Sequence, residues 1–81
     1  MAFNVAFSQN AVRKLGQLDY PTSILILSWI KKNLQNCYNP RAYGYQLEKF
    51  NYNYWKYRLG DYRILSLIEK DRVVILSVES K

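Results

Sequence analysis

The chain has 81 residues, 49% of them hydrophobic, which is enough for one small domain with one packed core. Its 12 Lys and Arg against 6 Asp and Glu give a formal net charge of +6, which fits equally a polyanionic partner, most often nucleic acid, or a soluble surface that is simply cationic. One cysteine and no histidine exclude an intrachain disulfide and disfavour a catalytic thiol or a zinc or iron site. We expect no metal, no cofactor and no membrane span, and a cytoplasmic location.

The first half of the chain predicts a strand followed by two helices. Residues 3–7 alternate between large apolar side chains and the smaller Asn4 and Ala6, a pattern that predicts a strand. Ser8 is a good N-cap for a short helix that Gly16 is expected to weaken or end. Pro21 suits the first turn of a second helix running to about Asn36. A strand is the competing interpretation of residues 24–30, but the Pro start and the polar tail favour a helix.

The second half of the chain predicts a three-stranded meander. Residues 38–53 are rich in Tyr and Asn without a clear period, so we expect a loop with some local order there. Strands are predicted at 54–59, 62–68 and 72–78. The order is β-α-α-β-β-β, an α+β fold in which a two-helix hairpin packs on one face of an antiparallel sheet that includes the N-terminal strand. Residues 1–81 form a single domain in this interpretation.

The predicted hairpin around Gly60-Asp61 places three cations on one face. A two-residue turn there pairs Leu59 with Tyr62 and sets Arg58 directly opposite Arg63. Lys56 lies two residues from Arg58 and therefore points to the same side. Like charges opposite each other destabilise a ladder, and folding alone has no need of them. A bound phosphate would relieve the repulsion, so the arrangement indicates a functional site.

Strict alternation extends this register to the other strands. One face of the hairpin holds Trp55, Tyr57, Leu59, Tyr62 and Ile64, and the other holds Lys56, Arg58, Arg63 and Leu65. In the last strand, alternation puts Val74, Leu76 and Val78 on the side of Leu65 and Leu67.

Aromatic side chains interleave with these and other basic residues, a pattern used to bind single-stranded RNA. For Trp55 and Tyr57 a place in the core is the better interpretation. For Tyr43, Tyr45 and Tyr52, stacking on a base and ordinary half-burial are equal alternatives. Arg41 follows a proline and is more often a solvated loop charge than a ligand. The candidate RNA-binding residues are Arg41, Tyr43, Tyr45, Lys49 and Tyr62.

Two segments carry a resemblance to a known family. The stretch Asn-Pro-Arg-Ala-Tyr-Gly at 39–44, then Leu47, and then Trp-Lys-Tyr-Arg-Leu-Gly-Asp-Tyr-Arg-Ile at 55–64 closely resemble the RelE/ParE toxin superfamily of bacterial toxin–antitoxin modules. The predicted strand at 73–78 and the β-α-α-β-β-β order fit as well. The likeness is nearer to the RelE-like branch, which cuts RNA on the ribosome, than to the gyrase-poisoning ParE branch.

The resemblance implies a toxin that enters the ribosomal A site and cuts mRNA without a metal. A ribose 2′-hydroxyl would attack the adjacent phosphate. By position in the family motif, Lys56 is the expected base, and Arg58 and Arg63 are expected to clamp the phosphate through planar forks. A lysine among arginines loses its proton more readily than one in water, which suits this role of Lys56. Lys81 matches the family's late arginine, although strict alternation puts it on the wrong face unless a bulge intervenes.

One departure from the family pattern leaves alternatives open. The family's terminal tyrosine is absent from a chain that is short at its C-terminus, so we expect weak or absent cleavage unless Tyr62 or a loop tyrosine substitutes. The expected partners are the ribosome, mRNA and a cognate antitoxin, whose acidic, partly helical segment would mask the basic groove. The alternatives are a module that only binds its antitoxin and a ParE-like gyrase poison.

Overall fold

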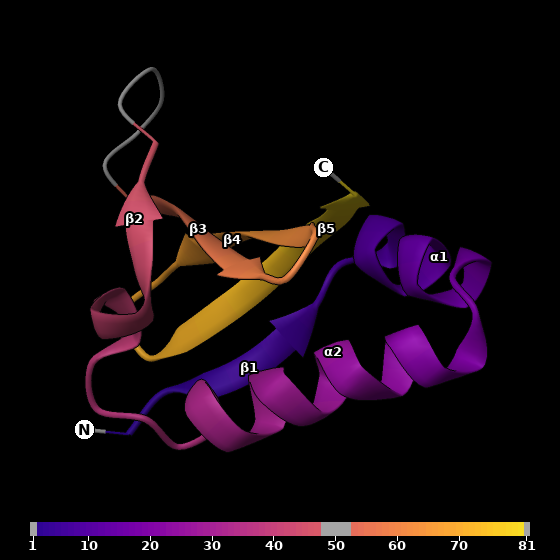
Figure 1. Ribbon diagram of the computed structural model, residues 1–81. Coiled ribbons are helices and arrows are strands. Elements are labelled where there is room, and N and C mark those ends of the chain that lie inside the picture. Colours follow the sequence, from indigo (N-terminus) through magenta and orange to yellow (C-terminus); the bar gives the residue numbers. More distant parts are fainter. Residues whose placement is uncertain (1, 48–52, 81) are drawn as a thin grey trace.

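The computed structural model describes residues 2–47 and 53–80. Its helices and strands follow one another in the predicted order, with one short 3₁₀ helix and one short strand added after the second helix. The strands are β1 (Asn4–Phe7), β2 (Gly44–Gln46), β3 (Tyr54–Leu59), β4 (Tyr62–Ile68) and β5 (Arg72–Ser80). The helices are α1 (Gln9–Gln17), α2 (Tyr20–Asn33) and the short 3₁₀ helix η1 (Pro40–Tyr43). Both long helices lie on the same side of the sheet (Figure 1). The predicted α+β class is confirmed.

Local signals explain where the helices begin and end. The Ser8 side chain accepts a hydrogen bond from the backbone N–H of Ala11 at 3.1 Å and so caps α1, as predicted. Gly16 does not stop α1, which ends one residue later. α2 starts with Pro21 in its first turn but ends at Asn33, short of the predicted Asn36. Asn36 instead has a φ of 62°, a left-handed conformation that asparagine tolerates, and its N–H donates to the Phe3 carbonyl.

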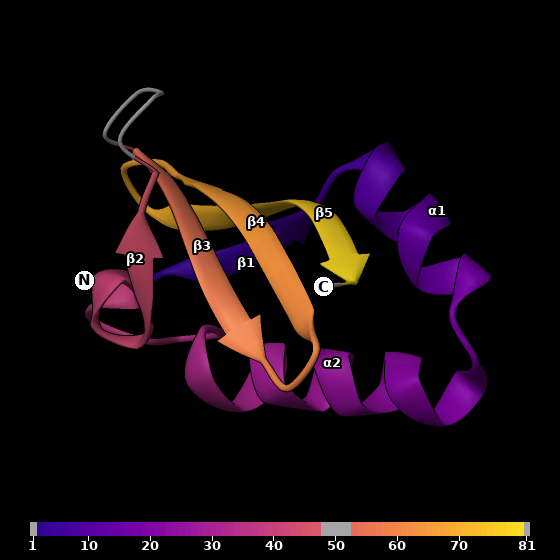
Figure 2. The same cartoon turned by 45° about the horizontal axis from the view of Figure 1, so that its top comes forward.

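The sheet is mixed, with the strand order β1-β5-β4-β3-β2. The hairpin strands β3 and β4 have the predicted bounds, and β5 continues to Ser80. β1 lies parallel to β5 at the edge of the sheet, whereas every other pair is antiparallel (Figure 2). The N-terminal strand was expected in an antiparallel sheet, but it runs parallel to β5. The sequence could not predict this direction, because the alternation of one short strand does not show which way its neighbour runs.

A short strand that the sequence does not predict forms inside the region expected to be a loop. β2 pairs with β3, with Gly44 opposite Tyr57 and Tyr45 opposite Lys56. A Cβ atom at Gly44 would lie 2.4 Å from the Lys56 carbonyl oxygen and 2.7 Å from the Tyr57 ring, so only glycine allows this close approach. Three residues are too few to show a strand period, which is why β2 was missed.

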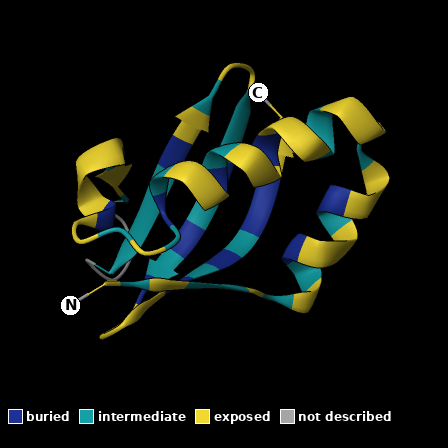
Figure 3. Cartoon of the chain, turned by 90° about the horizontal axis from the view of Figure 1, so that it is seen from below, coloured by how far each residue is buried: buried dark blue, intermediate teal, exposed yellow. Residues whose placement is uncertain are grey.

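The core lies between the two helices and one face of the sheet (Figure 3). Burial of apolar side chains on this face stabilises the domain, at about 25 cal/mol per Å² removed from water. The helices contribute Ala11, Leu15, Ile26, Ile30 and Leu34, and the sheet contributes Tyr57, Ile64, Val73, Ile75 and Val78.

A bulge between β4 and β5 changes which face the end of β5 presents. Leu65 pairs with Ser77, but the next residue of β4, Ser66, pairs with Ile75, so Leu76 has no partner in the ladder. The Leu76 carbonyl accepts hydrogen bonds from the side chains of Ser8 and Asn10, both at 3.0 Å. These bonds tie the start of α1 to the bulge.

The bulge makes the predicted orientation of Val78 wrong. Val78 pairs with Ile64 and is buried in the core, whereas strict alternation put it on the side of Leu65. Val74 pairs with Leu67, as predicted. The extra residue of the bulge inverts the faces of everything that follows it in β5.

Candidate nucleic-acid interface

The predicted turn and its opposed arginines are confirmed. Gly60 has a φ of 58°, and Leu59 pairs with Tyr62 across the turn. Arg58 therefore lies directly opposite Arg63. The Lys56–Leu65 pair lies two residues further along the same ladder, so Lys56 shares their face. We call Lys56, Arg58 and Arg63 the cation face; it lies on the side of the sheet away from the core.

A carboxylate that the sequence analysis missed also lies on the cation face. Glu79 pairs directly with Arg63, and its Oε1 atom lies 3.8 Å from Nζ of Lys56. The Lys56 side chain is 19% exposed and that of Glu79 is 50% exposed. Strict alternation would have put Glu79 on the core side, and the bulge at Leu76 is what brings it here. Lys81, for which a bulge was needed, lies outside the described residues.

Only one of the candidate aromatic residues lies beside the cation face. Tyr45 is opposite Lys56 in the β2–β3 ladder and is 41% exposed, so its ring is available to a ligand held there. Tyr43 is also exposed, but its ring meets that of Trp29 in α2 edge to face, 6.4 Å between centroids. Tyr62 packs against the core. The structure therefore separates Tyr43 and Tyr62 from the cations.

The remaining candidates lie elsewhere or outside the described residues. The Arg41 guanidinium carbon is 5.8 Å from the centroid of the Trp55 ring, a cation–π contact. Trp55 packs partly against the core, on the face opposite Lys56. Arg41 is thus held by the protein itself, away from the cation face. Lys49 and Tyr52 lie outside the described residues.

Tyr57 supports this region from the core side, as predicted. Its ring is fully buried and its hydroxyl donates a hydrogen bond of 2.7 Å to the carbonyl of Pro40 in η1. Burial raises the pKa of Tyr57 to about 12. The ring also lies against Trp29, 5.6 Å between centroids. These contacts join η1 and α2 to β3, next to Lys56 in the chain.

The repulsion between the opposed arginines should be measurable as a stability cost. Replacing Arg58 by glutamine is expected to raise the free energy of unfolding by about 0.2–1 kcal/mol, because it removes a like charge directly opposite Arg63. Arg72→Gln is the matched control, since Arg72 forms an ion pair with Glu69 and its loss should lower stability slightly. Urea titrations of the three proteins would give the values. A less stable Arg58→Gln protein would show that the arginines do not strain the hairpin.

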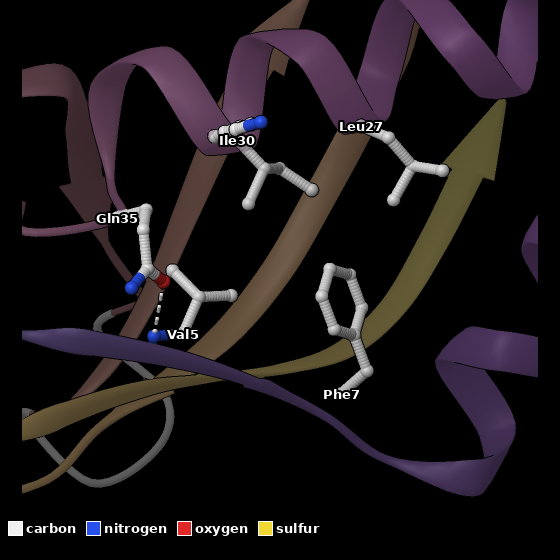
Figure 4. Close-up of a pocket in the computed structure, with 6 residues that line it drawn as sticks. Val5, Phe7, Leu27, Ile30 and Gln35 are labelled. Carbon is white, nitrogen blue, oxygen red and sulfur yellow. Dashed lines mark hydrogen bonds between the residues drawn. The ribbon is translucent and has the colours of Figure 1, made fainter.

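A second candidate site is an apolar groove along α2. Three adjoining hollows of about 350, 430 and 260 Å³ share Leu27 as a lining residue. In the first of them, Val5 and Phe7 of β1 lie across from Leu27 and Ile30 of α2 (Figure 4). Gln35 closes one end, where its side-chain oxygen accepts a hydrogen bond from the Val5 N–H at 3.0 Å. Exposed apolar surface of this kind is typical of a protein-binding site.

Two further classes of site are absent from the described parts of the chain. Within residues 2–47 and 53–80, no group of three or more His, Cys, Asp or Glu side chains could hold a metal ion. No helix in these ranges is both long and apolar enough to cross a membrane.

Comparison with known proteins places the chain in a family. Residues 5–81 match the family model described as the ParE toxin of the type II toxin–antitoxin system parDE. A search of curated protein sequences gives no match. The family model thus covers nearly the whole chain.

Solved structures of toxins have the same fold. The RelBE2 toxin–antitoxin complex of Mycobacterium tuberculosis matches with a TM-score of 0.87 and 25% identity, over 100% of this chain and 93% of that chain. A mutant of E. coli toxin RelE in the free state matches with a TM-score of 0.76 and 21% identity, over 99% and 84%. The archaeal RelE–RelB complex of Pyrococcus horikoshii matches with a TM-score of 0.70 and 19% identity, over 99% and 96%. The chain therefore belongs to the ParE toxin family within the RelE/ParE superfamily, and is the toxin of a type II toxin–antitoxin module.

Proposed function

We propose that this toxin inhibits translation in the cytoplasm by cutting mRNA in the ribosomal A site. The observation that carries the proposal is the cation face, where Arg58 and Arg63 are directly opposed and Lys56 is adjacent. A fold gains nothing from such opposition, whereas an RNA phosphate between the three side chains would be bound by all of them.

The proposed chemistry is metal-independent cleavage by the RNA itself. The ribose 2′-oxygen attacks the adjacent phosphorus while the bond to the 5′-oxygen breaks. Arg58 and Arg63 stabilise the charge that develops on the phosphate oxygens, because their planar forks donate to two oxygens at once. Lys56 accepts the proton of the 2′-hydroxyl, and the leaving 5′-oxygen takes a proton from solvent water. Tyr45, beside Lys56, stacks on a neighbouring base.

A reconstituted translation reaction tests this proposal. Purified toxin is added, and mRNA 5′ ends are mapped by primer extension, with and without ribosomes. Cuts in codon register that need ribosomes would support an endoribonuclease acting in the A site. Folded toxin that leaves translated mRNA intact would rule this activity out.

The apolar groove along α2 is the proposed docking site of the cognate antitoxin. Solved relatives are complexes of RelE with RelB, which supports an antitoxin partner for this chain. We expect the antitoxin to insert apolar side chains between β1 and α2, and its acidic segment to neutralise part of the +6 charge.

Leu27 is the residue through which this docking site can be tested. Leu27→Glu is expected to weaken binding of the cognate antitoxin at least about tenfold, because Leu27 lines all three hollows and a buried unpaired carboxylate would replace it. Leu25→Glu is the matched control, since Leu25 is exposed on the same helix but lines none of them. Calorimetric titration compares the two. Equal loss in both variants would mean that the groove is not the docking site.

Gyrase poisoning is the second candidate, because the matching family model is described as ParE. DNA breaks in toxin-expressing cells with intact mRNA would favour it over RNA cleavage. Tight antitoxin binding without either effect would indicate a module that only binds its antitoxin.

A further inference from the structure

Glu79 is a negative charge inside the proposed phosphate site. It pairs with Arg63 in the β4–β5 ladder, and Arg63 in turn pairs with Arg58. Its carboxylate lies 3.8 Å from the ammonium of Lys56 in β3, and its place in the β4–β5 ladder is directly opposite Arg63. Among the described residues of the strands, the cation face carries its three positive charges and the single carboxylate of Glu79. Asp61 lies in the turn itself.

The position of Glu79 depends on a specific backbone feature. The bulge at Leu76 turns Glu79 to the cation face, and hydrogen bonds from Ser8 and Asn10 to the Leu76 carbonyl hold that bulge. A carboxylate and a phosphate present the same kind of acceptor oxygens to lysine and arginine. Because the Glu79 side chain is half exposed, it can move aside at small cost, unlike a buried ion pair.

We propose that Glu79 is an internal counter-ion that occupies the phosphate site of the free toxin and that RNA must displace to bind. This inference rests on the proposed RNA-binding function of the cation face and adds a residue that limits RNA affinity. In the free protein, Glu79 reduces the repulsion among Lys56, Arg58 and Arg63. In the complex, the phosphate takes over that role, and the carboxylate repels it. Glu79 therefore lowers the affinity for RNA.

Binding of a short, fluorescently labelled single-stranded RNA tests the inference. Glu79→Gln is expected to raise the affinity about two- to fivefold, the range of a surface ion pair. The salt dependence should steepen by about 0.7 in log K per log salt, because one more cation becomes free to contact phosphate on a single strand. In a Lys56→Gln background, the gain from Glu79→Gln should shrink, since the cation that Glu79 contacts is gone.

Glu69→Gln is the matched control. It changes the net charge equally and also breaks an ion pair, that with Arg72, but at the other end of β4. Six residues along a strand span about 20 Å, twice the Debye length of about 10 Å at 0.1 M salt. We therefore expect Glu69→Gln to bind RNA like the wild type. Circular dichroism checks that both variants are folded.

The outcomes separate this inference from the proposed function. Tighter binding by Glu79→Gln alone supports the counter-ion. Equal gains in RNA affinity in Glu79→Gln and Glu69→Gln would overturn it, because the effect would then come from net charge alone. No gain in affinity in either variant would overturn it as well. If Lys56→Gln and Arg63→Ala bind RNA as well as the wild type, the cation face is not an RNA site, and both proposals fail.

Discussion

Arg63→Ala is expected to reduce mRNA cleavage on the ribosome on the order of a hundredfold or more, the typical cost of removing one electrostatic donor from a transition state. Arg63 is central to the cation face because it pairs with Arg58 on one side and with Glu79 on the other. Without the Arg63 guanidinium, the phosphate can still be bound by Arg58 and Lys56. It loses the hydrogen-bond donor that lies between Arg58 and Glu79. Primer extension on translated mRNA measures the rate.

The same substitution should leave the fold intact, which makes the loss interpretable. Arg63→Ala removes one unfavourable pairing, with Arg58, and one favourable pairing, with Glu79, and each has a size of about 0.2–1 kcal/mol. The two changes oppose each other, so thermal unfolding should shift little. Arg13→Ala, in an exposed position of α1, is the control for loss of one positive charge. Cleavage that survives Arg63→Ala, or falls equally in Arg13→Ala, would place the reaction elsewhere.

The hairpin was predictable because its signals are local. The Gly60-Asp61 turn sets the register of the two hairpin strands. This register places Arg58 opposite Arg63 and puts Lys56 on the same face of the sheet. Helix starts followed from Ser8 and Pro21 for the same reason: each acts within a few residues of itself. The family was recognised from this same hairpin motif, and the family model matches residues 5–81.

What the sequence could not predict depends on contacts between distant residues. The bulge at Leu76 is held by Ser8 and Asn10, more than sixty positions away, and it decides that Glu79 faces the cations. The sequence alternation along β5 does not show the bulge, so Glu79 was not predicted to lie on the cation face. β2 is equally non-local, because its pairing depends on the absence of a side chain at Gly44 against Tyr57 of β3.

The toxin is expected to lose stability between about pH 10 and pH 12 because of Tyr57. Burial raises the pKa of this phenol from 10.0 to about 12 in the folded state, while the unfolded chain ionises it at its ordinary value. The contribution of Tyr57 is fully present below pH 10 and is lost as the pH rises through 12, because only the unfolded state releases the proton in between. Two pKa units correspond to roughly 2–3 kcal/mol.

Tyr57→Phe isolates this contribution from every other group that titrates in alkali. At pH 7 the variant should be about 1 kcal/mol less stable, since the buried Pro40 carbonyl loses its donor. Towards pH 12 the order should reverse, because the phenylalanine has no proton to release on unfolding. Urea titrations at pH 7, 10 and 12 give the difference between the two proteins. Tyr20→Phe, on the exposed start of α2, is the control and should follow the wild type.

The decisive observation is whether the pH–stability curves of the wild type and Tyr57→Phe cross, because the Tyr57 hydroxyl links the core to the strand beside the cation face. The Tyr57 hydroxyl fastens η1 to β3 from the core side, and the next residues of the chain after η1 form β2, which carries Tyr45 to Lys56. If the crossing is found, the hydroxyl is buried as described, and Tyr57→Phe should also weaken RNA binding through Tyr45 more than Tyr20→Phe does. Parallel curves for wild type and Tyr57→Phe would mean that the hydroxyl reaches water, and that β2 is not positioned through Pro40.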